Sequence, residues 1–250
     1  MEVVIVLGGP NTKENIKNLL EYRYGKAYED FRFVGVDGGA LRLLDQHLPM
    51  EVAIGDFDSV TKEQRDLIHE AAGTIVPLPS EKDDTDFEAA LLWVKEHYKE
   101  TPIHVLGSFG GRVDHAISTL WTMMRPDLAP LIPYVVFEDA TNVVNFIQPG
   151  TYTIEKMDFT KYLSFISMTP VENVTLVDVK YTLDSKSYAY PVALVSNEFT
   201  SDKMTISFTK GLILVAIGDK TKHRTIRMNY LHQNQKEKII KSFACRTGNL

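Results

Sequence analysis

Short apolar runs that alternate with helix-length segments constrain the fold of residues 1–141 more than any other feature. Strands are predicted at six places: 3–7, 31–36, 52–54, 74–77, 103–106 and 134–137. Thr12 is expected to begin a helix that ends near Tyr24, and Thr61 to begin another. Strands that alternate with helices predict a mostly parallel sheet in a three-layer α/β domain.

The pattern changes after about residue 142. β-rich runs then follow one another at short intervals: 150–154, 162–168, 174–181, 193–199, 204–208 and 212–217. They predict a C-terminal all-β sandwich domain over residues 142–220, with 138–148 as the junction. Residues 221–250 form a basic extension with seven Lys and Arg against one Glu, and the sequence leaves their order open. We assign no function to this extension.

The composition excludes several classes of protein. No apolar run approaches the ~20 residues of a membrane span, and no basic region precedes the first apolar run, so we expect neither a membrane partner nor a signal peptide. The net charge of -6 argues against a nucleic-acid partner. The lone cysteine, Cys245, rules out an internal disulfide framework and fits a cytoplasmic location.

Two carboxylates follow the third predicted strand. The chain turns at Gly55 and then presents Asp56 and Asp58, one residue apart. Ligands of open α/β sheets bind beyond the carboxyl ends of the strands, and two neighbouring carboxylates suit Mg²⁺ shared with substrate phosphates. The alternative is an acidic loop without an ion, in which Asp58 and Ser59 only cap the next helix.

A second acidic cluster precedes a predicted helix. Asp83, Asp84 and Asp86 follow Lys82, and the helix after them has an apolar stripe. A helix N-terminus favours negative charge, which accounts for one or two of these residues as caps. Three Asp in four residues repel one another, and a bound cation would relieve that repulsion. Asp86 is therefore the predicted third metal ligand.

A glycine-rich turn joins the fifth predicted strand to a helix that carries Ile117, Leu120, Trp121 and Met124. Gly110 and Gly111 would let backbone approach a phosphate, and Arg112 would bind it with a planar, permanently charged group. Such turns are also common in folds that bind no nucleotide. His115 receives no catalytic role.

These motifs, in this order, resemble the thiamine pyrophosphokinase family. The resemblance rests on Gly55–Ser59 (55–59), on 82–86 and on the Gly-Gly-Arg-Val-Asp-His run at 110–115. Further similarity lies in the Val-Asp-Gly-Gly-Ala run at 36–40, in the Ser-Asn-Glu-Phe run at 196–199 and in residues 210–215. It extends over about residues 1 to 218.

The resemblance implies transfer of the diphosphoryl group of ATP to the hydroxyl of thiamine, giving thiamine diphosphate and AMP. Asp56, Asp58 and Asp86 would hold Mg²⁺ against the triphosphate, and Arg112 and Lys82 would balance its charge. The remaining nucleotide contacts are expected from turn residues: Gly8, Gly9, Asp37, Gly38, Gly39, Gly110, Gly111 and Asp114.

The resemblance also implies a homodimer, with thiamine between the α/β domain of one subunit and the β domain of the other. Ser196 and Asn197 would then hydrogen-bond the aminopyrimidine of thiamine. Without the resemblance, both would be interpreted as an ordinary polar strand end. An acidic protein suits the cationic, aromatic thiamine electrostatically.

Three other functions remain open. A haloacid-dehalogenase-like phosphatase would use the first Asp of the Asp56–Asp58 pair as a nucleophile, but here the pair follows the third strand instead of the first. A non-catalytic nucleotide or thiamine sensor has no need of three metal ligands. In a dimeric interaction module the clustered acidic residues would be accidental.

Overall fold

A computed structural model of the chain describes residues 1–10, 15–158 and 160–218. The chain divides into two compact units that meet between Ala140 and Thr141. We call them the N-terminal unit and the C-terminal unit. The expected Thr12 helix cap and the basic extension 221–250 lie outside the described residues.

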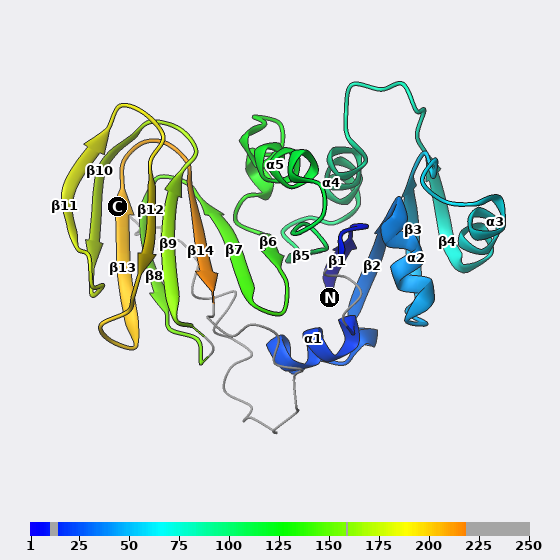
Figure 1. The fold of residues 1–250 in the computed structure, drawn as a ribbon, viewed down its shortest axis with the longest axis horizontal. Coiled ribbons are helices and arrows are strands. Elements are labelled where there is room, and N and C mark those ends of the chain that lie inside the picture. Colours follow the sequence, from blue (N-terminus) through cyan, green and yellow to red (C-terminus); the bar gives the residue numbers. More distant parts are fainter. Residues whose placement is uncertain (11–14, 159, 219–250) are drawn as a thin grey trace. The chain divides into compact units, whose positions relative to one another are not determined.

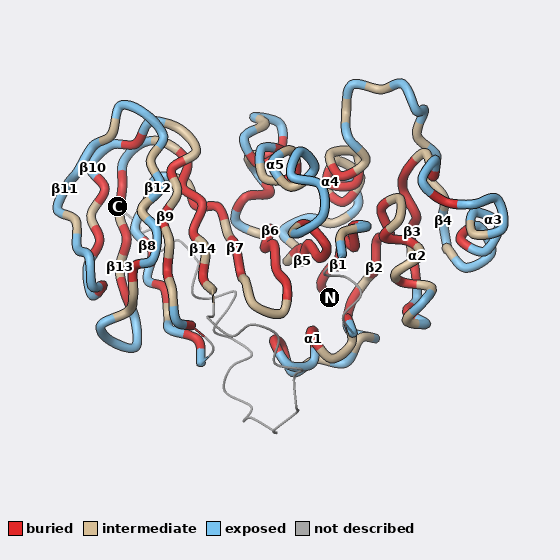
Figure 2. The backbone as a smooth tube through the Cα atoms, viewed as in Figure 1, coloured by how far each residue is buried: buried red, intermediate tan, exposed pale blue. Residues whose placement is uncertain are grey.

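The N-terminal unit contains a parallel sheet with the strand order β6-β5-β1-β2-β3-β4. Its strands are β1 (Glu2–Val6), β2 (Phe31–Val36), β3 (Met50–Gly55), β4 (Ala72–Pro77), β5 (Ile103–Leu106) and β6 (Val135–Glu138). All six lie within two residues of their predicted positions, because each is a short apolar run between turn residues. β1, β5 and β6 are buried along their whole length, as parallel strands covered on both faces should be (Figure 2).

Helices cover both faces of this sheet. They are α1 (Ile16–Tyr24), α2 (Gly38–Asp45), α3 (Lys62–Ala71), α4 (Asp86–His97) and α5 (Val113–Trp121). Right-handed crossovers place α1, α2 and α3 on one face and α4 and α5 on the other, and Figure 1 shows α1 opposite α4 and α5. The three-layer α/β prediction is confirmed.

Capping residues fix where the helices begin. Thr61 and Thr85 each form a capping box, with Gln64 and Glu88 respectively. Asn15 caps α1, its side chain accepting a hydrogen bond from the amide of Asn18, so this helix begins later than predicted. α2 was not predicted, because the glycine pair at its start is typical of a turn.

The C-terminal unit is built from two antiparallel four-stranded sheets, β12-β9-β14-β7 and β11-β10-β13-β8, as the sandwich prediction requires (Figure 1). Its strands are β7 (Asn142–Ile147), β8 (Gly150–Glu155), β9 (Tyr162–Ser167), β10 (Val171–Val177), β11 (Leu183–Tyr188), β12 (Ala193–Asn197), β13 (Lys203–Phe208) and β14 (Ile213–Gly218). Alternating residues of β9 and β13 are buried, which is the pattern of strands with one face toward a core.

The boundary between the two units lies inside the junction predicted at 138–148. That range also contains a strand that was not predicted, β7, which pairs with β14 along its whole length. The single run predicted at 174–181 is instead β10, which begins at Val171 and ends at Val177, and a separate strand β11 follows.

Three loops that carry the sequence motifs follow neighbouring strands of the N-terminal sheet: Gly8–Gly9 (8–9) after β1, Asp37 after β2, and Asp56–Asp58 (56–58) after β3. They gather at one edge of the sheet because its strands are parallel. The direction of the connections reverses between β1 and β5, which is where open α/β sheets bind ligands. None of the helices in the described part of the chain is long and apolar enough to cross a membrane.

Candidate active site

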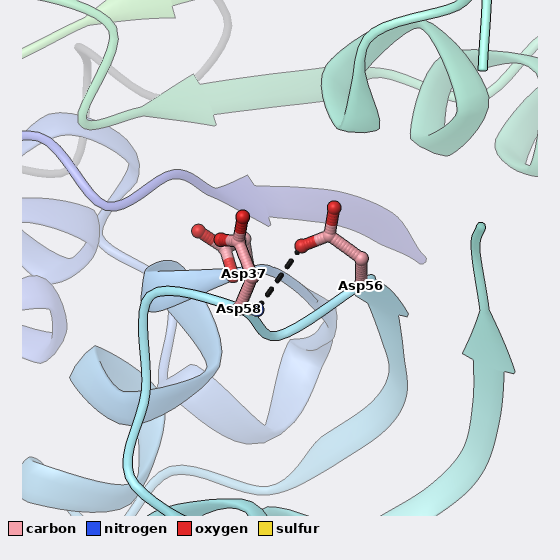
Figure 3. Close-up of side chains that lie close together, drawn as sticks. All are labelled: Asp37, Asp56 and Asp58. Atoms are coloured by element: carbon pink, nitrogen blue, oxygen red, sulfur yellow. Dashed lines mark hydrogen bonds between the residues drawn. The ribbon is translucent and has the colours of Figure 1, made fainter. Parts of the chain in front are cut away.

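Three carboxylates meet where β2 and β3 end. Asp37, Asp56 and Asp58 each offer an oxygen, and these oxygens lie within 4.8 Å of one another. Figure 3 shows the three side chains pointing to the same side of their loops. Asp37 was expected to contact nucleotide; the structure places it beside the predicted metal ligands Asp56 and Asp58.

The close approach of the two loops depends on Gly55. A Cβ on this residue would lie 3.2 Å from the Cα of Asp37, and its φ of +153° is unfavourable for other residues. The amide of Asp37 donates to the carbonyl of Ile54 at 2.9 Å, which ties the end of β2 to the end of β3. Asp37 itself has a φ of 45°, a conformation that costs a non-glycine residue free energy and is typical of functional loops.

Local hydrogen bonds hold the acidic turn in shape. Oδ1 of Asp56 accepts from the amide of Asp58 at 3.1 Å, and Oδ2 of Asp37 accepts from the hydroxyl of Ser59 at 2.8 Å. Arg65 of α3 donates to the carbonyl of Phe57, the residue between the two aspartates, at 2.8 Å. Phe57 is buried with a φ of 54°, so its backbone turns the two carboxylates outward.

The donor set of this group fits a divalent cation. Carboxylate oxygens are the ligands that Mg²⁺ prefers. Oδ1 of Asp37 is buried, and it has no hydrogen-bond partner among the described residues. A buried, unsatisfied acceptor is costly, and a bound cation would satisfy it.

Lys82 joins Asp86 to the carboxylate group. Its Nζ lies 3.1 Å from Oδ1 of Asp86 and 3.4 Å from Oδ2 of Asp56. Asp86 lies outside the set of three close carboxylates, so the structure places the predicted third ligand beside Lys82. Lys82 therefore connects the loop after β3 to the first residue of α4.

The surroundings shift the pKa values of these groups in different directions. The amide of Asp58, followed by Lys82, lowers the pKa of Asp56. Burial raises the pKa of Asp86, against the opposing effect of Lys82. Burial opposes the charge of Lys82, but its contacts with Asp86 and Asp56 outweigh burial and raise its pKa. Lys82 is thus a permanent positive charge beside the carboxylates.

The structure changes the interpretation of the acidic cluster 83–86. A bound cation was predicted to relieve the repulsion among its aspartates. Two side chains already do so: Lys82 pairs with Asp86, and Arg125 pairs with Asp84 at 2.5 Å. No sequence signal connects Arg125 to this cluster, because it lies 41 positions from Asp84.

The glycine turns after β1 and β5 touch each other. A Cβ on Gly9 would lie 2.1 Å from the carbonyl oxygen of Gly107, so only glycine fits there. Gly8 and Gly38 also lie close, since a Cβ on Gly8 would be 3.5 Å from the Cα of Gly38. Gly39 follows in the first turn of α2. This is the point where the connections of the sheet reverse direction, and glycines there let a ligand approach the backbone closely.

The predicted phosphate-binding arginine lies on the surface. Arg112 and Asp114 form an ion pair at 2.6 Å, with 70% and 64% of their side chains exposed. Arg112 lowers the pKa of Asp114 to about 2. Gly110 and Gly111 precede them with φ values of 83° and 73°, so this turn needs its glycines.

Comparisons with known proteins match both units. The family profile "Thiamin pyrophosphokinase, catalytic domain" matches residues 28–133, and "Thiamin pyrophosphokinase, vitamin B1 binding domain" matches residues 151–213. A thiamine pyrophosphokinase from Bacillus subtilis (strain 168) is 33% identical over 213 residues, which are 84% of this chain and 95% of the relative.

The chain belongs to the thiamine pyrophosphokinase family. Solved structures of the family share its fold. The thiamin pyrophosphokinase family protein from Enterococcus faecalis has a TM-score of 0.79 and 31% identity, over 88% of this chain and 100% of that one. The thiamine pyrophosphokinase from Bacillus subtilis has a TM-score of 0.74 and 30% identity over the same shares.

The two residues expected to contact thiamine have different environments within the region that matches the vitamin B1 binding domain. Asn197 is buried, and its Oδ1 accepts from the amides of Tyr181 and Glu198, both at 2.9 Å. Its Nδ2 donates to the carbonyl of Tyr181 at 2.9 Å. Ser196 is exposed, with a φ of 59°. The side-chain amide of Asn197 thus supports the local backbone, whereas the side chain of Ser196 is accessible to a ligand.

Proposed function

We propose that this protein transfers the diphosphoryl group of ATP to the hydroxyl of thiamine in a Mg²⁺-dependent reaction, giving thiamine diphosphate and AMP. The observation that carries the proposal is the match of one chain to both the catalytic and the vitamin B1 binding domains of the thiamine pyrophosphokinase family. The group of Asp37, Asp56 and Asp58 at the ligand-binding edge of the sheet supports it.

In this reaction the thiamine hydroxyl oxygen bonds to the β-phosphorus, and the bond between that phosphorus and the bridging oxygen of AMP breaks. The proton of the hydroxyl is lost and AMP leaves with the bridging oxygen. Positioning and charge neutralisation supply most of such catalysis. Bound Mg²⁺ would neutralise phosphate charge and orient the oxygens of the triphosphate.

We assign roles to the site residues on that basis. Asp56 and Asp58 hold Mg²⁺ with Asp37, whose buried Oδ1 needs a partner. Asp86 is the further candidate ligand, held near Asp56 by Lys82. Lys82 then balances phosphate charge, because three carboxylates and a triphosphate need positive charge beyond one Mg²⁺.

The glycine turns receive the nucleotide. Gly8 and Gly9 lie where the direction of the connections reverses between β1 and β5, and Gly38 lies close to Gly8; their lack of side chains supports close backbone contact with phosphate or ribose. Arg112, with Asp114 as its partner and Gly110 and Gly111 before it, acts on the phosphates from the surface turn. Arginine suits this role because its planar group binds phosphate through two hydrogen bonds.

We further propose a cytoplasmic homodimer in which Ser196 contacts thiamine. Support for the dimer comes from an apolar row on α5, where Val113, Ile117 and Trp121 are 71%, 45% and 62% exposed. Apolar residues at helical spacing usually face a core, and a row left at the surface favours coverage by a second copy. Analytical ultracentrifugation tests this: a dimer is expected, and Trp121→Glu should convert it to monomer.

Incubation of the purified protein with ATP, Mg²⁺ and thiamine, followed by chromatography, tests the reaction. Thiamine diphosphate with equimolar AMP is the expected result. ADP with thiamine monophosphate would indicate an ordinary kinase, and free phosphate without a thiamine product would indicate the phosphatase alternative. Thiamine or nucleotide binding without turnover would indicate a sensor.

A further inference from the structure

Arg125 connects the end of one helical segment to the start of another. It follows the 3₁₀ turn η3 (Thr122–Met124), and its Nη1 lies 2.5 Å from Oδ1 of Asp84 and 3.4 Å from Oε1 of Glu88. Asp84 precedes α4 and Glu88 lies in its first turn. Only 28% of the Arg125 side chain is exposed, so these contacts are partly shielded from solvent.

The two acidic partners of Arg125 lie around the helix cap that positions Lys82 and Asp86. Oε2 of Glu88 accepts from the amide of Thr85 at 2.8 Å and from its hydroxyl at 3.0 Å. Asp84 lies between Lys82 and Asp86 in the sequence. Arg125 therefore holds both sides of the turn from which Lys82 and Asp86 reach the carboxylate group.

The guanidinium of Arg125 is itself oriented from its other edge. Its Nε and Nη2 donate to Oδ1 and Oδ2 of Asp127 at 3.1 and 2.8 Å, in a two-point pair. Lys95 of α4 donates to the carbonyl of Asp127 at 2.6 Å, which ties the segment after η3 to the body of α4. A planar group fixed on one edge presents its remaining donor in one direction.

We infer that Arg125 is a positioning residue for Lys82 and Asp86: it fixes the turn before α4 so that both groups face the Asp56 side of the site. The inference rests on the proposed function, in which Lys82 and Asp86 act on the metal and the triphosphate. It explains why the turn contains Asp84, an acidic residue that has no role in the proposed reaction. Arg125 touches neither substrate nor metal in this scheme.

Kinetics of Arg125→Gln test the inference. The variant should lower kcat and raise KM for ATP with Mg²⁺ by about tenfold each, since small displacements of positioning groups have effects of that size. KM for thiamine should change less than about twofold, because the substitution does not alter the C-terminal unit. Arg125→Lys should recover only part of the loss, because lysine keeps the positive charge but lacks the planar set of N–H donors of arginine. Unchanged kinetics, or equal increases in both KM values, would overturn the inference.

Two controls separate positioning from general stability. Arg32→Gln removes a similar arginine, which pairs with Glu51 at 3.5 Å near the opposite ends of the strands, and it should leave all three kinetic constants unchanged. Asp84→Asn should reproduce the Arg125→Gln effect, and the double variant should be no worse than either single one. Additive losses would mean that the two residues act separately, against the inference.

Two further measurements do not depend on turnover. Hydrogen exchange of amides 82–88 should be faster in Arg125→Gln than in the wild type, with exchange in β1 and β5 unchanged. Calorimetry with Mg²⁺ and ATP, without thiamine, should show about tenfold weaker binding. If the wild type produces no thiamine diphosphate, the proposed reaction is wrong, but hydrogen exchange and ATP affinity still test whether Arg125 fixes the turn before α4. Unchanged affinity, or a wild type that binds no ATP, would overturn the inference.

Discussion

Nζ of Lys82 lies 3.4 Å from Oδ2 of Asp56, although the two residues are 26 positions apart in the sequence. Both side chains are largely buried, with 15% and 12% exposed. The ammonium group thus neutralises one of the three carboxylates of the candidate metal site. Any cation that binds to Asp56 must share it with Lys82, and any phosphate that binds brings Lys82 a second partner.

The shared carboxylate predicts opposite effects of Lys82→Gln on two ligands. Affinity for Mn²⁺ alone should rise about fivefold, because a positive charge that repels the ion is removed from a site near the surface. Affinity for ATP with Mg²⁺ should fall, since the triphosphate loses a cationic partner. Titration of Mn²⁺ by electron paramagnetic resonance and of ATP by calorimetry measures the two effects. Lys62→Gln, at an exposed position of α3, is the matched control and should change neither. A parallel loss of both affinities would show that Lys82 only supports the fold.

Asp58 should be needed for catalysis and not for stability. Its side chain is exposed, and the contact that shapes the turn uses its backbone amide, which a substitution preserves. Asp58→Asn should lower kcat by at least about 100-fold while changing the unfolding free energy by less than about 0.5 kcal/mol. Steady-state kinetics and urea unfolding measure these values. Asp66→Asn removes the same charge at an exposed position of α3 and is the matched control. Near-normal activity of Asp58→Asn would show that Asp58 does not bind the metal.

The sequence predicts the N-terminal sheet well because its strands are buried on both faces. Such strands are continuous apolar runs, so β5 was placed at its observed bounds. β7 was missed because Asn142 and Asn145 interrupt its apolar run. Its strand conformation depends on pairing with β14, which no local pattern indicates. The division between β10 and β11 depends on their register, which shifts along the pair and has no local signal.

The position of a site residue was predictable where it directly follows one strand, and less predictable where it depends on contacts between two elements. Asp56 and Asp58 follow a single buried strand, which the sequence shows directly. The placement of Asp37 beside them depends on how β2 and β3 pair and on the missing side chain of Gly55. The contacts of Arg65 with Phe57 and of Arg125 with Asp84 join separate elements, so no local pattern predicts them.

Ser196 and Asn197 should separate thiamine binding from stability. Ser196→Ala removes an exposed hydroxyl and should raise KM for thiamine about tenfold without changing the melting temperature. Asn197→Ala removes three hydrogen bonds to backbone groups of a buried turn and should cost about 2 kcal/mol of unfolding free energy. Thermal unfolding and thiamine-dependent kinetics measure both variants. The assignment of Ser196 fails if its variant keeps a normal KM for thiamine.

A buried cluster of charged groups lies in the N-terminal unit around His104, whose side chain is completely inaccessible. Its Nδ1 and Nε2 lie 3.1 Å from Oε1 of Glu138 and from Oε2 of Glu2, and Lys26 pairs with Glu2. Tyr24 donates to Glu138 at 2.7 Å and stacks edge-on against the His104 ring, and Arg23 lies 3.7 Å from Glu138. Burial opposes protonation of His104, but the two glutamates outweigh it and raise its pKa above 6.5.

This cluster should make stability depend on pH through His104. A histidine whose pKa is raised on folding stabilises the folded state fully below its unfolded pKa, and this contribution is lost as pH rises through the folded pKa. Glu2 acts in the other direction. Burial opposes its charge, yet hydrogen bonds from His104 and Lys26 lower its pKa to about 2, so the stability that Glu2 contributes is lost as pH falls below about 4.5.

His104→Gln should cost about 3 kcal/mol of unfolding free energy at pH 6, because both glutamates lose a charged partner, and less at pH 9. Urea unfolding at both values measures the difference, with His47→Gln, at an exposed position, as control. An equal cost of His104→Gln at pH 6 and pH 9 would mean that the buried ring does not change its protonation state between these pH values.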